Sequence, residues 1–150
     1  MVDRQARDIA AAVIRQFIDG IITNVEYERK FPRNKQDPAL WAVDSHMWFY
    51  FSDVSEHTLT GKHALNDEGL AFFERCILFL RTDLEFDWPT PRISLKYTII
   101  RLLGFGWALK RQEEKHEMEM RAIGDTEVWP FLKKTDYEKA VSKYNQPTNI

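Results

Sequence analysis

The feature that most constrains the fold is an apolar pattern of helical period near the N-terminus. Pairs of apolar residues recur every four positions, at Ile9–Ala10, Val13–Ile14, Phe17–Ile18 and Ile21–Ile22. Because an α-helix repeats every 3.6 residues, this spacing predicts one helix with a broad apolar face. Asp3 is a suitable N-cap, so we expect the helix to run from about Arg4 to about Thr23. Its solvent side then carries Arg7, Arg15 and Asp19.

Two further segments show helical spacing together with a start signal. Asp37-Pro38 combines an N-cap with proline at the first helical position, and apolar spacing continues from there to Phe51. Residues 47–51 are apolar on all sides, so we expect this helix to be central; a buried strand is the alternative for these five residues. Asn66 begins a helix that we expect to end near residue 83. Its predicted buried positions are Leu70, Phe73, Cys76, Ile77 and Leu80.

The second half of the chain is less regular. Two prolines stiffen residues 84–91 into an extended segment, and residues 93–109 are predicted to form an apolar helix. Residues 110–121 are polar on nearly every face, which indicates an exposed helical extension or a mobile arm. Thr135 to Glu138 has the pattern of a capping box for a last helix that ends near Tyr144. We therefore expect an all-α, single-domain bundle of about five helices over residues 1–150, with a proline-stiffened aromatic and acidic loop.

Composition excludes several classes of protein. Aromatic residues make up 13% of the 150 residues, which argues against disorder, and Cys76 alone allows no internal disulfide. The charged N-terminus does not resemble a signal peptide, and the most apolar stretch, 97–109, is too short to span a bilayer. We therefore expect a cytoplasmic protein with no membrane contact. The chain has no phosphate loop, dinucleotide fingerprint or nucleophile elbow, so we expect no cofactor, no catalytic residue and no enzymatic activity.

Charge distribution indicates a protein partner. The net charge of −2 disfavours nucleic acid, but residues 53–87 carry a local charge of −5 and precede a basic segment, 88–112, of +5. Carboxylates alternate with Phe86 and Trp88 in the extended segment. An acidic, aromatic surface of this kind suits a basic partner, and its predicted residues are Asp53, Glu56, Asp83, Glu85 and Asp87. In the alternative interpretation, the charge blocks pair locally, the aromatic side chains dock on the core and the acids are merely hydrated.

Two other functions remain open at this point. His57 and His63 lie six residues apart beside Asp53 and Glu56, so a metal-dependent enzyme is one alternative. A structural or regulatory homo-oligomer that pairs through residues 110–121 is the other. Metal binding would require these four side chains to converge, whereas oligomerisation would require an exposed helix.

Two strings resemble a known group of proteins. Residues 75–89, which end in an aromatic–acidic–Trp-Pro sequence, resemble a motif in small uncharacterised bacterial proteins, and residues 124–131 with Asp136-Tyr137-Glu138 are similar to their C-terminal part. Such proteins are encoded near contact-delivered polymorphic toxins. The resemblance covers about a third of the chain and implies an immunity protein that occludes its cognate toxin. It implies no catalytic residues.

Overall fold

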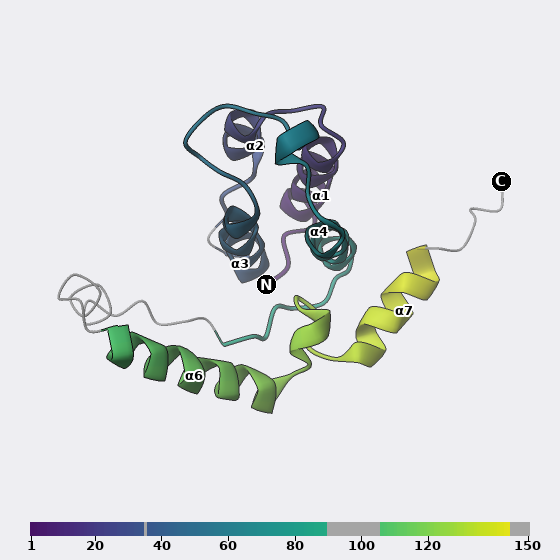
Figure 1. Ribbon diagram of the computed structural model, residues 1–150. Helices are drawn as coiled ribbons and strands as arrows, with labels where there is room; N and C mark the ends of the chain where they lie inside the picture. Colours follow the sequence, from purple (N-terminus) through teal and green to yellow (C-terminus); the bar gives the residue numbers. More distant parts are fainter. Residues whose placement is uncertain (35, 90–105, 145–150) are drawn as a thin grey trace.

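The computed structural model describes residues 1–34, 36–89 and 106–144. In these ranges it has six α-helices, three short 3-10 helices and no strand, so the all-α prediction is confirmed and the strand alternative for residues 47–51 is wrong. The α-helices are α1 (Arg4–Ile18), α2 (Asn24–Lys30), α3 (Pro38–Met47), α4 (Asp67–Leu80), α6 (Gly106–Ile123) and α7 (Lys134–Tyr144) (Figure 1). The 3-10 helices are η1 (Trp48–Tyr50), η2 (Gly61–His63) and η3 (Thr126–Val128).

Helix α1 begins where the sequence predicts and ends earlier. The Asp3 side chain accepts a hydrogen bond from the backbone N–H of Ala6, as expected of an N-cap. Gly20 has a φ of +68°, which other residues rarely adopt, and the chain turns there. Thr23 then begins α2 with a capping box to Glu26, so residues 24–30 form a separate helix that the sequence analysis did not predict.

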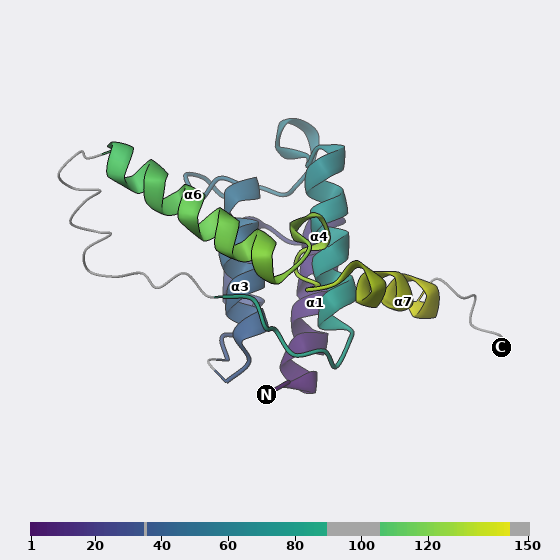
Figure 2. The ribbon, with the colours of Figure 1, turned by 90° about the horizontal axis from the view of Figure 1, so that it is seen from below.

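Helices α1 and α4 pack side by side and antiparallel (Figure 2). At the N-terminal end of α1, the Arg4 guanidinium donates to the backbone carbonyl of Leu80, the last residue of α4. Further along α1, Arg15 Nη1 donates to Glu74 Oε1 at 2.6 Å and Arg15 Nη2 donates to Glu74 Oε2 at 2.5 Å. The apolar faces of these helices form most of the main core, with Phe17, Phe73 and Cys76 fully buried.

Helix α3 starts at the predicted signal but is less central than expected. The Asp37 side chain accepts a hydrogen bond from Ala39 N at 3.1 Å, and Pro38 occupies the first helical position. The all-round apolar run at 47–51 predicted a central helix, and Met47 is indeed fully buried, but Trp48 is 45% exposed and Phe49 is 86% exposed. The α-helix ends at Met47 and continues as η1, and no other described element covers the outer side of this turn.

A buried ion pair joins α1 to the start of α3. Arg7 is fully buried, so its predicted solvent exposure is wrong. Its Nε and Nη2 donate to the two Asp37 carboxylate oxygens at 2.6 and 3.0 Å, and its Nη1 donates to the carbonyls of Thr82 and Leu84 at 3.2 and 2.8 Å. Burial alone would raise the pKa of Asp37, but the hydrogen bonds from Arg7 and from the backbone N–H of Asp3 hold it below its usual value. Arg7 therefore ties three separate segments together.

Residues 81–89 connect α4 to the C-terminal half along an extended path. The Trp88 indole N–H donates to the Pro130 carbonyl at 2.9 Å, and the Trp88 side chain is buried. Phe86 lies edge-on to Phe79 and to Trp129, with ring centroids 6.2 and 6.1 Å away. The aromatic side chains of this segment therefore anchor it to the two hydrophobic clusters of the core.

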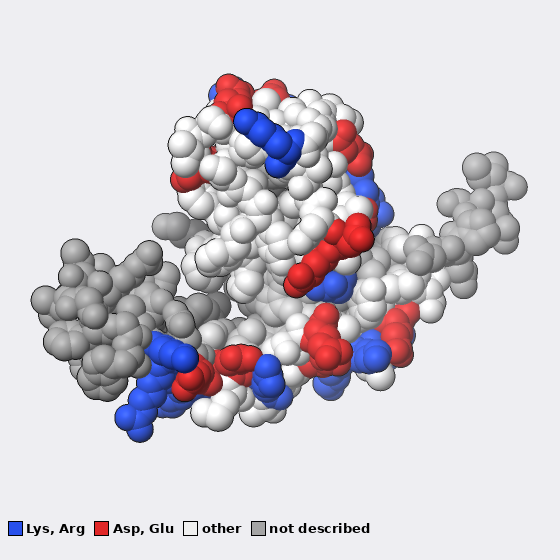
Figure 3. Space-filling view, in the orientation of Figure 1, with Lys and Arg blue, Asp and Glu red and all other residues white. Residues whose placement is uncertain are grey.

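The C-terminal helices have largely exposed surfaces. Basic and acidic side chains alternate along α6 (Figure 3), and Arg121 pairs with Glu117 at 2.6 Å. This helix confirms the predicted extension over residues 110–121. The helix predicted over 93–109 lies outside the described residues except for 106–109, which belong to α6. No helix in the described ranges combines the length and apolar character needed to cross a membrane.

Two finer predictions are wrong. Leu70, predicted to be buried on α4, is 44% exposed. The capping box predicted at Thr135 is absent from that position, because α7 already begins at Lys134 and Thr135 lies inside its first turn. The backbone carbonyl of Lys133 accepts the first hydrogen bonds of this helix, from Asp136 and Tyr137.

Candidate protein-binding surface

The five acidic residues predicted to bind a partner fall into two groups at opposite ends of α1. Asp83 lies 3.3 Å from Arg4 at the start of this helix. Glu56 accepts a hydrogen bond at 2.8 Å from the hydroxyl of Thr23, which lies beyond the other end of the helix. The 15 residues of α1 rise by about 22 Å. The structure therefore does not bring the five carboxylates together on one surface.

The group at the start of α1 comprises Asp83, Glu85 and Asp87, which we call the acidic strip. All three side chains are exposed, whereas the intervening Phe86 and Trp88 dock on the core. Glu85 also lies 3.7 Å from the N-terminal ammonium group. The acidic strip thus has the arrangement that the rim-loop interpretation predicts, with its three carboxylates in solvent and the intervening Phe86 and Trp88 packed on the core.

The other group lies in a segment that does expose apolar side chains. We call residues 48–56 the aromatic loop. Phe49 is 86% exposed, Val54 is 90% exposed and Trp48 is 45% exposed. Asp53 and Glu56 are exposed on the same loop. The aromatic and acidic combination that the sequence analysis assigned to residues 83–88 is therefore found on the surface at residues 48–56.

A buried asparagine holds the aromatic loop in place. Asn24, at the start of α2, is only 2% exposed. Its side-chain amide donates to the carbonyls of Ser52 and Ser55 at 3.0 and 3.1 Å, and its side-chain oxygen accepts from His57 N at 2.9 Å. The backbone N–H of Asn24 donates to the His57 carbonyl at 2.9 Å. The sequence analysis missed this residue, because nothing in the local pattern links position 24 to a loop about 30 residues later.

The two histidines predicted as metal ligands do lie together, next to the aromatic loop. The rings of His57 and His63 stack with centroids 4.0 Å apart and an interplanar angle of 25°. His57 Nδ1 lies 2.8 Å from the Ser55 carbonyl and so carries the proton of that hydrogen bond. Partial burial, with the charges of His57 and Lys62 nearby, lowers the pKa of His63. Within the described ranges, no three His, Cys, Asp or Glu side chains are grouped so that they could hold a metal ion.

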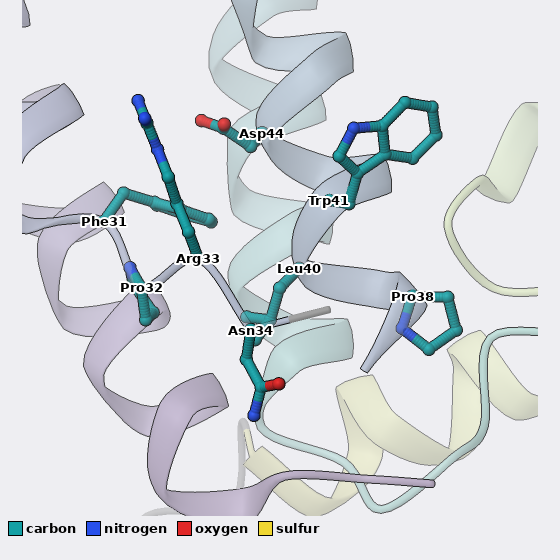
Figure 4. Close-up of a pocket in the computed structure, with 8 residues that line it drawn as sticks. All are labelled: Phe31, Pro32, Arg33, Asn34, Pro38, Leu40, Trp41 and Asp44. Carbon is teal, nitrogen blue, oxygen red and sulfur yellow. The ribbon is translucent and has the colours of Figure 1, made fainter. Parts of the chain in front are cut away.

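A cavity lies beside the first half of α3, away from the end of this helix at which the aromatic loop begins. Trp41 is 47% exposed and precedes Trp48 by seven residues, so both lie on one side of the helix. The cavity has a volume of about 610 Å³ and lies between α3 and residues 31–34. Figure 4 shows the Asp44 carboxylate between the side chains of Arg33 and Trp41. The lining is completed by Phe31, Pro32, Asn34, Pro38 and Leu40.

Asp44 is the acidic group of this cavity. Its Oδ1 accepts a hydrogen bond from the Tyr27 hydroxyl at 3.0 Å. Burial raises the pKa of Asp44, while the Tyr27 hydrogen bond and the positive charge of Arg33 act in the opposite direction. Burial and the Asp44 carboxylate also raise the pKa of Tyr27 well above its usual value, so the hydroxyl stays protonated and remains a donor.

The chain matches no protein-family model, no curated protein and no solved structure. The geometry of the surface itself therefore carries the functional conclusion. Three features bear on it, namely the exposed aromatic loop, the asparagine that fixes the loop and the cavity beside Asp44.

Proposed function

We propose that this protein is a protein-binding module, and more specifically an immunity protein that covers the basic active-site cleft of a cognate toxin. The observation that carries the proposal is the aromatic loop, which presents Trp48, Phe49 and Val54 to solvent beside two carboxylates. Such a mechanism needs no chemistry of its own, because a protein that occupies a cleft inhibits by excluding the substrate.

Exposure of these side chains favours binding over a purely structural role. Phe49 leaves most of its surface in water, and removing a large aromatic side chain from water contributes about 1.5–3 kcal/mol. Aromatic residues are common among the few side chains that dominate binding energy at interfaces. Asp53 and Glu56, at the edge of the same loop, suit the rim, where opposite charges speed the encounter with a basic partner.

Pre-organisation of the loop adds to this argument. Asn24 fixes the loop backbone through three side-chain hydrogen bonds. A loop that is already ordered loses less conformational entropy when it binds. The part of the loop that carries Asp53 and Val54 is therefore held in position before binding, whereas Trp48 and Phe49 lie in η1, before the first of these contacts at Ser52.

The resemblance of residues 75–89 and 124–131 to immunity-type proteins supports the same proposal. In the structure these strings form the end of α4, the docked segment with Trp88, and the turn around Trp129 and Phe131. They are core-forming elements, so they support a shared architecture. The binding surface proposed here lies elsewhere, in the aromatic loop.

The proposal is tested by capture and by growth protection. Tagged wild-type protein and the variant Phe49→Ala are used to capture partners from a lysate of the source organism. We expect the wild type to retain a stoichiometric partner and the variant to bind it at least about 30-fold more weakly. Co-expression of the wild type should restore growth of cells that produce the partner's terminal domain.

Met118→Ala is the matched control, because Met118 is also a large apolar side chain, 65% exposed, but lies on α6. It should bind the partner like the wild type and should leave the protein's oligomeric state unchanged. Equal binding by Phe49→Ala and the wild type would refute the role of the aromatic loop. A partner that does not harm cells would refute immunity while leaving protein binding in place.

A further inference from the structure

The cavity between α3 and residues 31–34 has the dimensions and lining of a binding pocket. Its volume of about 610 Å³ lies within the usual range for ligand sites. Apolar side chains, including Pro32, Pro38 and Leu40, form most of its wall. A few polar groups converge on the space, as Figure 4 shows for Asp44 and Arg33. Such a pocket favours a ligand with an apolar stem and one charged end.

The Asp44 carboxylate determines the sign of that charged end. It is half-buried, and among the described residues its one hydrogen bond comes from the Tyr27 hydroxyl to Oδ1. The second oxygen, Oδ2, has no protein donor there and is not among the buried atoms that lack a partner, so water reaches it from the cavity. A cation that enters the cavity supplies the missing donors, and hydrogen bonds between ionised groups are about twice as strong as neutral ones.

Arg33 does not make the cavity a site for anions. Its side chain is exposed and remains hydrated, so an anion would gain little from it. An anion would also approach the partly desolvated Asp44 carboxylate, which cannot move away because Tyr27 holds it. A cation at Asp44 meets only weak repulsion from Arg33, because water screens that charge.

Trp41 forms the outer wall and favours one type of cation. Trp41 is 47% exposed and is one of the residues that line the cavity. A planar guanidinium stacks on an indole face more readily than an ammonium does, and it presents several N–H donors at fixed angles. The apolar wall then covers the three methylene groups of an arginine side chain.

We propose that this cavity receives an arginine side chain of the partner protein, with its guanidinium on the Asp44 carboxylate and against Trp41. This inference rests on the proposed function, and it specifies the partner's contact chemistry. Trp41 lies on α3 and Trp48 follows the last residue of this helix, seven positions after Trp41, so the cavity and the aromatic loop lie on the same side of the helix. The partner's arginine would thus lie about 6 to 10 Å along the helix axis from Trp48, since Asp44 and Trp41 precede Trp48 by four and seven residues.

The test uses N-acetyl-arginine amide as the probe and N-acetyl-citrulline amide as its uncharged counterpart. Citrulline has nearly the same shape but lacks the positive charge. Binding to the full-length protein is followed by amide chemical shifts in NMR titrations. We expect the arginine probe to bind with a dissociation constant on the order of millimolar and to shift the signals of Trp41 and Asp44. The citrulline probe should bind at least about tenfold more weakly.

Variants of opposite expected effect sharpen the test. Asp44→Asn keeps an acceptor for Tyr27 but removes the charge, so the arginine probe should bind about tenfold more weakly or worse. Arg33→Gln removes the repelling charge, so binding should strengthen about two- to threefold. Asp67→Asn, at the exposed start of α4, serves as the control and should leave probe binding unchanged.

The inference is overturned if the two probes bind equally, if their shifts fall outside this cavity, or if Asp44→Asn binds the arginine probe like the wild type. Its failure is distinguishable from failure of the proposed function. A lost probe interaction with intact partner capture refutes only the arginine site. Specific probe binding without any captured partner supports the cavity and refutes the proposed function.

Discussion

Removing one partner of the buried ion pair between Arg7 and Asp37 should strongly destabilise this protein, because the other charge is left buried without its partner. We consider the substitution Arg7→Met, which keeps an unbranched side chain of similar length and removes the charge. It leaves the Asp37 carboxylate buried, and within the described ranges the remaining donors to it are the backbone N–H groups of Asp3 and Ala39. It also removes the donors that reach the carbonyls of Thr82 and Leu84.

The size of the effect follows from these contacts. Breaking a buried pair by removing one partner costs about 3–5 kcal/mol. Each of the two lost carbonyl hydrogen bonds adds about 0.5–1.5 kcal/mol. We therefore expect Arg7→Met to lower the free energy of unfolding by about 4–8 kcal/mol. Asp37→Asn should cost about 3–5 kcal/mol, because Arg7 keeps its two carbonyl partners and the asparagine can still cap α3.

Urea unfolding followed by tryptophan fluorescence and circular dichroism measures these free energies. A stable domain has only about 5–15 kcal/mol in total, so Arg7→Met should be largely unfolded at 37 °C. Arg15→Met is the matched control on the same helix, since its partner Glu74 is 44% exposed, and it should cost less than about 1 kcal/mol. The double variant Arg7→Met/Asp37→Asn should cost less than the two single variants added together. Additive effects, or an Arg7→Met effect as small as that of the control, would refute the reasoning.

The aromatic loop, the stacked histidines and the acidic strip each carry one further prediction. Asn24→Ala removes three side-chain hydrogen bonds and should cost about 2–4 kcal/mol and speed amide hydrogen exchange over residues 52–57; unchanged exchange there would contradict it. The pKa of His63 is lowered in the folded state, so the unfolded chain binds a proton at this residue more readily. The melting temperature of the wild type should therefore fall between pH 7 and pH 5, and that of His63→Gln should fall less. An equal fall in both proteins would contradict this prediction. Replacing all three carboxylates of the acidic strip by Ala should lower the free energy of unfolding by less than about 2 kcal/mol, since they make only exposed contacts, and a loss above about 3 kcal/mol would show a structural role.

The helix starts were predictable from the sequence because their signals act within one turn. Asp3 and Asn66 each accept a hydrogen bond from a backbone N–H three residues later, and Asp37 does so two residues later. Proline at the start of α3 acts equally locally, through its fixed backbone angle. The end of α1 and the separate helix α2 were not predicted. The apolar spacing continues past Gly20, but the backbone of Gly20 has a positive φ, which an α-helix does not have, so the helix ends before it.

The candidate site was only partly predictable. The sequence indicated that aromatic and acidic side chains would share a surface, and it included Asp53 and Glu56 among the predicted residues. It assigned the aromatic part to Phe86 and Trp88, but in the structure Trp88 is buried and Phe86 packs partly buried against the core. An extended segment with alternating residue types has two faces, but the alternation does not say which face the rest of the protein covers.

Local chemistry in the sequence thus determined the helical class, the helix starts and the types of residue at the surface. The tertiary structure alone decided that Arg7 is buried, because its partner Asp37 lies 30 residues away along the chain. It also decided that Phe49 is exposed, since an apolar side chain is buried only where another element packs over it. Burial depends on contacts between segments that are distant in the sequence, so it cannot be predicted from the spacing of residues within one segment.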